Sequence, residues 1–271
     1  MKKLLALLLA ALLVASLCAC GDKKEEQTTY QKENEIIEDR IVDAVGDSFY
    51  FESIDSETVR IINFAGPSAP HAVTVPSVIR DKTVTEIAEG AFRAASNITV
   101  LNLPATLEKI DSYAFAESSV TTVAFPASLQ KIGSYAFAGC ANLTTVTFAE
   151  GATLTEIPDA AFINCGITAI TIPASIKLIG NGAFMANVAL ASVTLSEGVE
   201  MVGNGAFQGC KALATLTLPA SLAEIGEYVF SGSDNLYMSG VTAPAGSVAE
   251  AYIAAMRLAA AAPAAPADPA E

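Results

Sequence analysis

Histidine, the side chain most often used for acid–base catalysis and metal binding, occurs once among the 271 residues, at His71. A single histidine cannot form the common His-rich metal sites, and no nucleophile stands at a recognisable spacing from it. We therefore expect His71 to lie in a surface loop. The sequence predicts no metal site, no cofactor and no catalytic residue.

Two glycine-rich segments, Gly180-Asn181-Gly182 and Gly203-Asn204-Gly205, are similar in composition to phosphate-binding loops. They stand at matching positions before an Ala-Phe pair and lack the G-K-[ST] ending of such loops. We interpret both as turns. The patterns H-E-x-x-H and G-x-S-x-G are also absent, so the chain is not expected to be an enzyme.

Three cysteines, Cys140, Cys165 and Cys210, each follow a phenylalanine by three residues. The same place elsewhere holds Asn, Ser or Ala, so it requires a small side chain, often one that bonds to backbone in a turn. We predict buried, reduced thiols. Cys140 and Cys165 belong to adjacent units, where a Cα separation of ~4.4–6.8 Å would allow a disulfide. Side chains that point the same way disfavour that bond, and it remains the alternative.

The net charge of −14, from 15 Lys+Arg and 29 Asp+Glu, excludes two classes of partner. A nucleic-acid binder needs a basic face that displaces counterions from phosphates. Docking on anionic lipid needs a basic patch. A hydrophobic content of 52% supplies enough apolar side chain for a core and excludes a wholly disordered chain.

The first twenty residues have the pattern of an export signal. Lys2 and Lys3 form a basic start, and an apolar run follows from Leu4 to Leu17, too short for a comfortable membrane span. The ending Leu17-Cys18-Ala19-Cys20-Gly21 resembles the lipobox of bacterial lipoproteins, which implies lipid attachment at Cys20. An ordinary cleaved signal peptide is the alternative.

Both ends of the mature chain differ in composition from its centre. Residues 21–40 are charged at their start and read as a flexible tether between lipid and domain. Residues 259–271 form an Ala/Pro tail that we expect to be disordered, because repeated proline prevents a continuous helix.

The centre of the chain is an internal repeat of about 23 residues. Seven phenylalanines are separated by steps of 23, 22, 25, 22, 23 and 23 residues, and aliphatic residues stand five and eight positions before every one. The 25-residue step holds two extra residues within Ala149–Thr153. The repeat phenylalanines are Phe92, Phe115, Phe137, Phe162, Phe184, Phe207 and Phe230.

The other half of each unit is a short strand with alternating apolar residues. In NLTTVTF the inward residues are Leu143, Val146 and Phe148, and five other units hold aliphatic or aromatic residues in the same frame. One unit cannot close a core by itself. Stacked units bury their apolar residues against one another, and their strands then form a parallel sheet along one side.

The recurring pattern L-x-x-V-T-L-P-x-S-L-x-x-I-G-x-x-A-F-x-G-C resembles the BspA-type leucine-rich repeats of bacterial surface proteins. Segments such as ITAITIPASIKLIGNGAF and LATLTLPASLAEIGEYVF carry the likeness. It implies a curved, right-handed solenoid of seven repeats, with a parallel sheet on one face and turns and short helical segments on the other. We expect an N-terminal cap and first-unit strands in 41–85, repeats in 86–240 and a C-terminal cap in 241–258.

The outward side of the strands is the first candidate for a binding face, although its small polar residues lack the Trp, Tyr and Arg typical of hot spots. Tyr113, Tyr135 and Tyr228, two residues before a repeat phenylalanine, are the second candidate. The strand-face residues are Asn102, Thr122, Thr145, Thr147, Thr171, Ser192, Thr194, Thr215 and Thr217.

The lipobox predicts a lipid-anchored protein on the extracellular face of a bacterial membrane, and we expect it to be a monomer. The resemblance to the repeat family implies that it binds another protein, in adhesion to host or envelope proteins. The lipid would be its only membrane contact. The alternative is a passive structural spacer or envelope-assembly component without a specific ligand.

Overall fold

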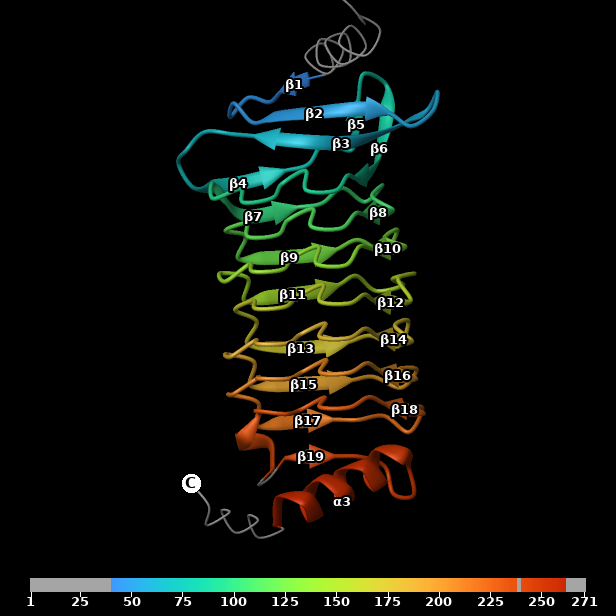
Figure 1. Ribbon diagram of the computed structural model, residues 1–271. Coiled ribbons are helices and arrows are strands. Elements are labelled where there is room, and N and C mark those ends of the chain that lie inside the picture. Colours follow the sequence, from blue (N-terminus) through green and yellow to red (C-terminus); the bar gives the residue numbers. More distant parts are fainter. Residues whose placement is uncertain (1–39, 238–239, 262–271) are drawn as a thin grey trace, which may run out of the picture. The chain divides into compact units, whose positions relative to one another are not determined.

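The computed structural model describes residues 40–237 and 240–261, which form a stack of similar coils (Figure 1). The predicted signal segment, the tether up to residue 39 and the tail from residue 262 lie outside the described residues. Each coil contributes one strand to a row of parallel strands along one side, which confirms the predicted solenoid. These strands are β4 (His71–Thr74), β7 (Ile98–Asn102), β9 (Thr122–Phe125), β11 (Thr145–Phe148), β13 (Ala169–Ile172), β15 (Ser192–Leu195), β17 (Thr215–Thr217) and β19 (Val241–Thr242).

The parallel register places equivalent residues of successive repeats beside one another. Val123 of β9 pairs with Val146 of β11, and Val193 of β15 pairs with Leu216 of β17. Their side chains point inward and are at most 5% exposed. Alternation along each strand therefore sends Thr, Ser and Ala to solvent, as the period-two pattern predicts.

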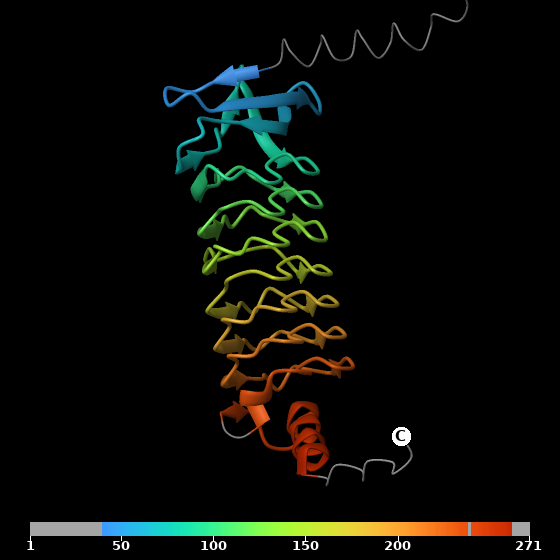
Figure 2. The ribbon, with the colours of Figure 1, turned by 60° about the vertical axis from the view of Figure 1, so that its left-hand side comes forward.

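The opposite side of the solenoid carries a second row of strands and tight turns where the sequence predicted turns and short helical segments (Figure 2). In every repeat the residues two before and two after the phenylalanine have positive φ. Left-handed residues at this spacing reverse the chain before a helical turn can form. The second row comprises β8 (Lys109–Ile110), β10 (Lys131–Ile132), β12 (Glu156–Ile157), β14 (Leu178–Ile179), β16 (Met201–Val202) and β18 (Glu224–Ile225).

The core is a continuous row of phenylalanine rings enclosed by the two rows of strands. The seven repeat phenylalanines are at most 3% exposed, and neighbouring rings stack with centroids 4.8–5.8 Å apart. The aliphatic residues five and eight positions before each ring are buried as well, except Ile225 in the last coil, which is half-buried. The predicted ladder of core residues is confirmed.

Both rows of strands are interrupted at the 25-residue repeat. Strand β11 does not pair with β13, nor β10 with β12, so the solenoid contains two separate pairs of sheets (Figure 1). The extra residues after β11 form a turn in which Gly151 has φ 75° and the amide of Ala152 bonds to Ala149. We attribute the interruption to this insertion, which changes where the next coil starts.

The ends of the stack have their own elements. At the start β1 (Arg40–Val42), β2 (Ser48–Ser53) and β3 (Thr58–Ala65) pair antiparallel. The first unit follows with β4 (His71–Thr74), β5 (Val78–Ile79) and β6 (Lys82–Ile87), and β3 pairs parallel with β6.

The other end is closed by a 3-10 turn, η1 (Asp234–Tyr237), and by the helix α3 (Val248–Ala261) (Figure 2). Ser247 accepts the amide of Glu250, whose carboxylate in turn accepts the amide of Gly246, so α3 begins with a reciprocal cap. Ala249 and Ile253 are buried against the last coil. The helix extends to Ala261, beyond the predicted end of the cap at residue 258.

Candidate functional site

The prediction that His71 lies in a surface loop is wrong. His71 is the first residue of β4, and its side chain is 17% exposed. Its Nε2 lies 2.9 and 3.0 Å from the two carboxylate oxygens of Asp47, a residue that is itself 1% exposed. The two residues lie in segments outside the predicted repeats, and so sequence periodicity did not indicate this pair.

The three described cysteines lie inside the turns as reduced thiols, as predicted. Cys140, Cys165 and Cys210 donate to the carbonyl oxygens of Phe115, Phe137 and Phe184, at 3.0, 3.1 and 3.3 Å. Serine and asparagine donate in the same way at this place in other repeats, which explains why small donors occupy it.

The setting of Cys165 and Cys210 opposes reactivity, because the thiolate is the nucleophilic form. Cys140 differs, since its hydrogen bond with Cys165 lowers its pKa against the opposing effect of burial. Burial raises the pKa of Cys210 to about 12. The contact with Cys140 together with burial raises the pKa of Cys165 well above its ordinary value. These are structural groups that satisfy the carbonyls of the turns.

The predicted strand-face residues lie side by side on the outer surface of the two parallel sheets. Thr145, Thr147, Thr171, Thr215 and Thr217 are exposed. The remaining predicted residues, Asn102, Thr122, Ser192 and Thr194, are exposed or half-buried. None of these residues is aromatic, so the face offers hydrogen bonds without an anchor for a partner.

The turns on one edge of the solenoid hold a cluster that we call the tyrosine edge, defined as Arg93, Tyr113, Glu117 and Tyr135. The two tyrosine rings stack with centroids 5.0 Å apart and planes at 6°. The guanidinium of Arg93 lies 5.9 Å from the centre of the Tyr113 ring and donates to Glu117 at 2.9 Å. Both rings are more than a third exposed, at 37% and 38%.

The backbone of these tyrosines is strained. Tyr113, Tyr135 and Tyr228 have φ of 57°, 60° and 56°, in the left-handed region that residues with a Cβ avoid. The same place holds glycine or alanine in the other four repeats, and the fold therefore does not need a ring there. The left-handed backbone recurs at this place in every repeat, so it belongs to the turn and the tyrosine rings are additions to it.

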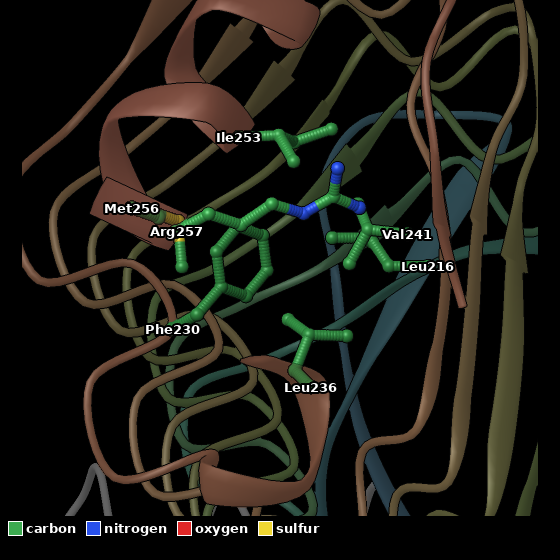
Figure 3. Close-up of a pocket in the computed structure, with 7 residues that line it drawn as sticks. All are labelled: Leu216, Phe230, Leu236, Val241, Ile253, Met256 and Arg257. Carbon is green, nitrogen blue, oxygen red and sulfur yellow. The ribbon is translucent and has the colours of Figure 1, made fainter. Parts of the chain in front are cut away.

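Of two hollows among the described residues, one is small and the other is shallow. A cavity of about 20 Å³ between α3 and the last coil has an apolar lining that includes Phe230, Ile253 and Met256 (Figure 3), and its volume corresponds to about one water molecule. A shallow hollow of about 260 Å³ lies over Leu178 and Met201. Ligand pockets usually enclose roughly 300–1,000 Å³, and neither hollow is of this kind.

Two further features are absent from residues 40–237 and 240–261. No cluster of three or more His, Cys, Asp or Glu side chains is placed to hold a metal ion. No helix in this part of the chain is long and apolar enough to cross a membrane.

The repeat geometry agrees with a family comparison. The model of the BspA type leucine rich repeat region matches in six copies, over residues 71–190 and 108–237. The chain belongs to this bacterial family, whose members are repeat scaffolds without enzymatic chemistry that mediate interactions in general. A search of the curated proteins finds no match.

Solved structures resemble the chain to different degrees, and the first of those below shares its fold. The leucine rich repeat protein of T. pallidum is 30% identical with a TM-score of 0.63, over 69% of this chain and 87% of that one. The pneumococcal vaccine antigen PcpA is 19% identical with a TM-score of 0.43, over 75% and 81% of the two chains. A leucine rich cell surface protein from Faecalibacterium prausnitzii is 16% identical with a TM-score of 0.32, over 79% and 97%.

Proposed function

We propose that the chain is held on the extracellular face of a bacterial membrane by a lipid on Cys20 and that its solenoid binds a protein of the host or of the cell envelope. The tyrosine edge is the observation that carries the binding proposal. It combines exposed Tyr and Arg, two of the three residue types most enriched at hot spots.

The composition of the surrounding turns supports the same surface. Ser112 and Ser134 precede the two tyrosines, and Asn181 and Asn204 stand at the same repeat position further along the edge. Tyr, Ser, Gly and Asn dominate antibody paratopes, because rigid rings supply contact area and small polar residues supply adaptable hydrogen bonds. The strand face lacks the rings, and we assign it a structural role in the sheet.

The binding proposal is tested with a double variant, Tyr113→Gly with Tyr135→Gly. Glycine relieves the left-handed strain and is the residue that other repeats hold there, so the coil should stay folded. The purified chain is first used to isolate a saturable partner from host extracellular proteins and from the envelope fraction. We expect the variant to bind that partner at least about tenfold more weakly, measured by titration, since hot-spot side chains each contribute more than 1 kcal/mol.

The matched control is the double variant Thr145→Ala with Thr147→Ala on the strand face, which should bind as the unchanged chain does. If this variant loses binding and the tyrosine variant keeps it, the binding face is the strand side. If a folded chain captures no saturable partner from either pool, the passive spacer replaces the binding proposal.

The anchor is tested separately by Cys20→Ala. Two acyl chains on the cysteine would hold the protein stably on the membrane, because each buried methylene contributes about 0.8 kcal/mol. We expect the variant to leave the membrane fraction for the soluble fraction, as followed by immunoblotting of fractionated cells, while Cys18→Ala stays with the membrane. Retention of the Cys20 variant would contradict a lipid at this residue.

A further inference from the structure

The imidazole of His71 is surrounded by hydrogen-bond acceptors. Its Nδ1 lies 2.9 Å from the carbonyl oxygen of Ala69, and its Nε2 faces the Asp47 carboxylate at 2.9 and 3.0 Å. A neutral imidazole has one N–H and can donate at only one of these places. Both contacts are hydrogen bonds only when the ring carries two protons.

The carboxylate that faces this ring has been removed from water. Asp47 is 1% exposed, and its own amide donates to Asp43 at 2.9 Å. Gly66 covers it so closely that a Cβ there would lie 2.3 Å from its Oδ1. A buried carboxylate is costly without a partner, and His71 is the cation placed to pair with it.

This pair connects two parts of the fold. Asp47 ends the turn between β1 and β2, and His71 begins β4, the first strand of the first parallel sheet. The amide of His71 also bonds to the carbonyl of Asn97, which precedes β7. The pair therefore fastens the antiparallel cap to the first coil of the repeats.

We infer that the N-terminal cap is held on the solenoid by a proton on His71, so that acid tightens the cap and alkali loosens it. Loss of the proton removes one of the two ring hydrogen bonds and leaves the buried Asp47 carboxylate facing a neutral ring. The inference is independent of the proposed protein binding, because it concerns the cap and not the tyrosine edge.

The charges around His71 support a protonated ring. The Ala69 carbonyl and the Asp47 carboxylate raise the pKa of His71 above its ordinary value of 6.5, against the opposing effect of burial, and Asp43 adds to the rise. The turn between β1 and β2 supplies both acidic groups. The segment between β3 and β4 supplies the carbonyl, and the Asn97 amide on the side of β7 is neutral.

The direction of the pH effect follows from this raised pKa. The folded chain binds the proton more tightly than the unfolded chain, so the proton stabilises the fold. That contribution is complete below about pH 6.5, the unfolded value, and is lost as the pH rises through the folded pKa.

The first experiment is a histidine NMR titration of the full chain, folded and in urea. His71 is the only histidine, so its ring signals need no assignment. We expect the folded midpoint to lie above the urea midpoint, and Asp47→Asn to move it down. A folded midpoint at or below the urea value overturns the inference without the need for any variant.

The second experiment measures hydrogen exchange of peptides from residues 40–75 relative to peptides from residues 190–220 in the same sample. The ratio cancels the intrinsic effect of pH on exchange. We expect it to rise several-fold between about pH 6 and about pH 8.5 in the unchanged chain and to stay constant in His71→Gln. A ratio that is independent of pH in the unchanged chain overturns the inference.

Discussion

Replacement of Phe137 with alanine should lower the free energy of unfolding by about 3–5 kcal/mol, the range for truncation of a buried aromatic side chain. Phe137 is fully buried and lies in the middle of the ring stack, with centroids 5.0 Å from Phe115 and 5.3 Å from Phe162. Phe125 also meets it edge-on at 5.6 Å. The loss would therefore weaken the contact of the coil with both neighbours, which is where a repeat protein obtains its stability.

Urea unfolding followed by circular dichroism measures this loss. Tyr228→Ala is the matched control, because that ring is 70% exposed and alanine already occupies the equivalent position as Ala160. We expect the control to change stability by less than about 1 kcal/mol. An equally small effect of Phe137→Ala would show that the row of rings is not the core.

The repeat made the fold predictable from one sequence. Each position was sampled seven times, so a residue such as Ile110 was recognised as inward by its equivalents and not by its own context. Comparison of equivalent positions does not, however, reveal features that occur in one repeat alone. The two extra residues after β11 were recognised as an insertion in a turn, but the pattern does not encode hydrogen bonding between coils, and so the division of both rows of strands was not predicted.

The second row of strands was missed because the signal lay in the backbone and not in hydrophobicity. Glycine recurs two residues before the phenylalanine, at Gly90, Gly182 and Gly205, and its recurrence there indicates a left-handed backbone. That observation would also have identified Tyr113 and Tyr135 as strained residues. Period-two alternation was used instead, and it made the strand face the first candidate for binding.

The pair of His71 and Asp47 was not predictable by these means. The two residues lie 24 positions apart in a part of the chain without repeats. Their contact depends on how the antiparallel cap folds back over the first coil. A single sequence contains no equivalent position with which to compare either residue.

The turns also predict an effect of adding a single methyl group, in Gly133→Ala. Gly133 is buried at the start of a turn, where its amide donates to the Ile110 carbonyl at 2.7 Å. A Cβ at this residue would lie 2.3 Å from the backbone nitrogen of Ser112 in the preceding coil. Backbone cannot rotate away as a side chain can, so the two coils must separate. We expect a loss of about 1–3 kcal/mol, the usual cost of overpacking.

The adjacent change Ser134→Ala places the same side chain in the same turn and should alter stability by less than about 0.5 kcal/mol, because Ser134 is half-buried and its Cβ is already accommodated. Urea unfolding of both variants separates close packing of the coils from a general sensitivity of the turn. Equal stability of Gly133→Ala and the unchanged chain would mean that neighbouring coils can move apart by the width of a methyl group without loss. The coils would then be held mainly by the ring stack, and the backbone bonds between turns would contribute little.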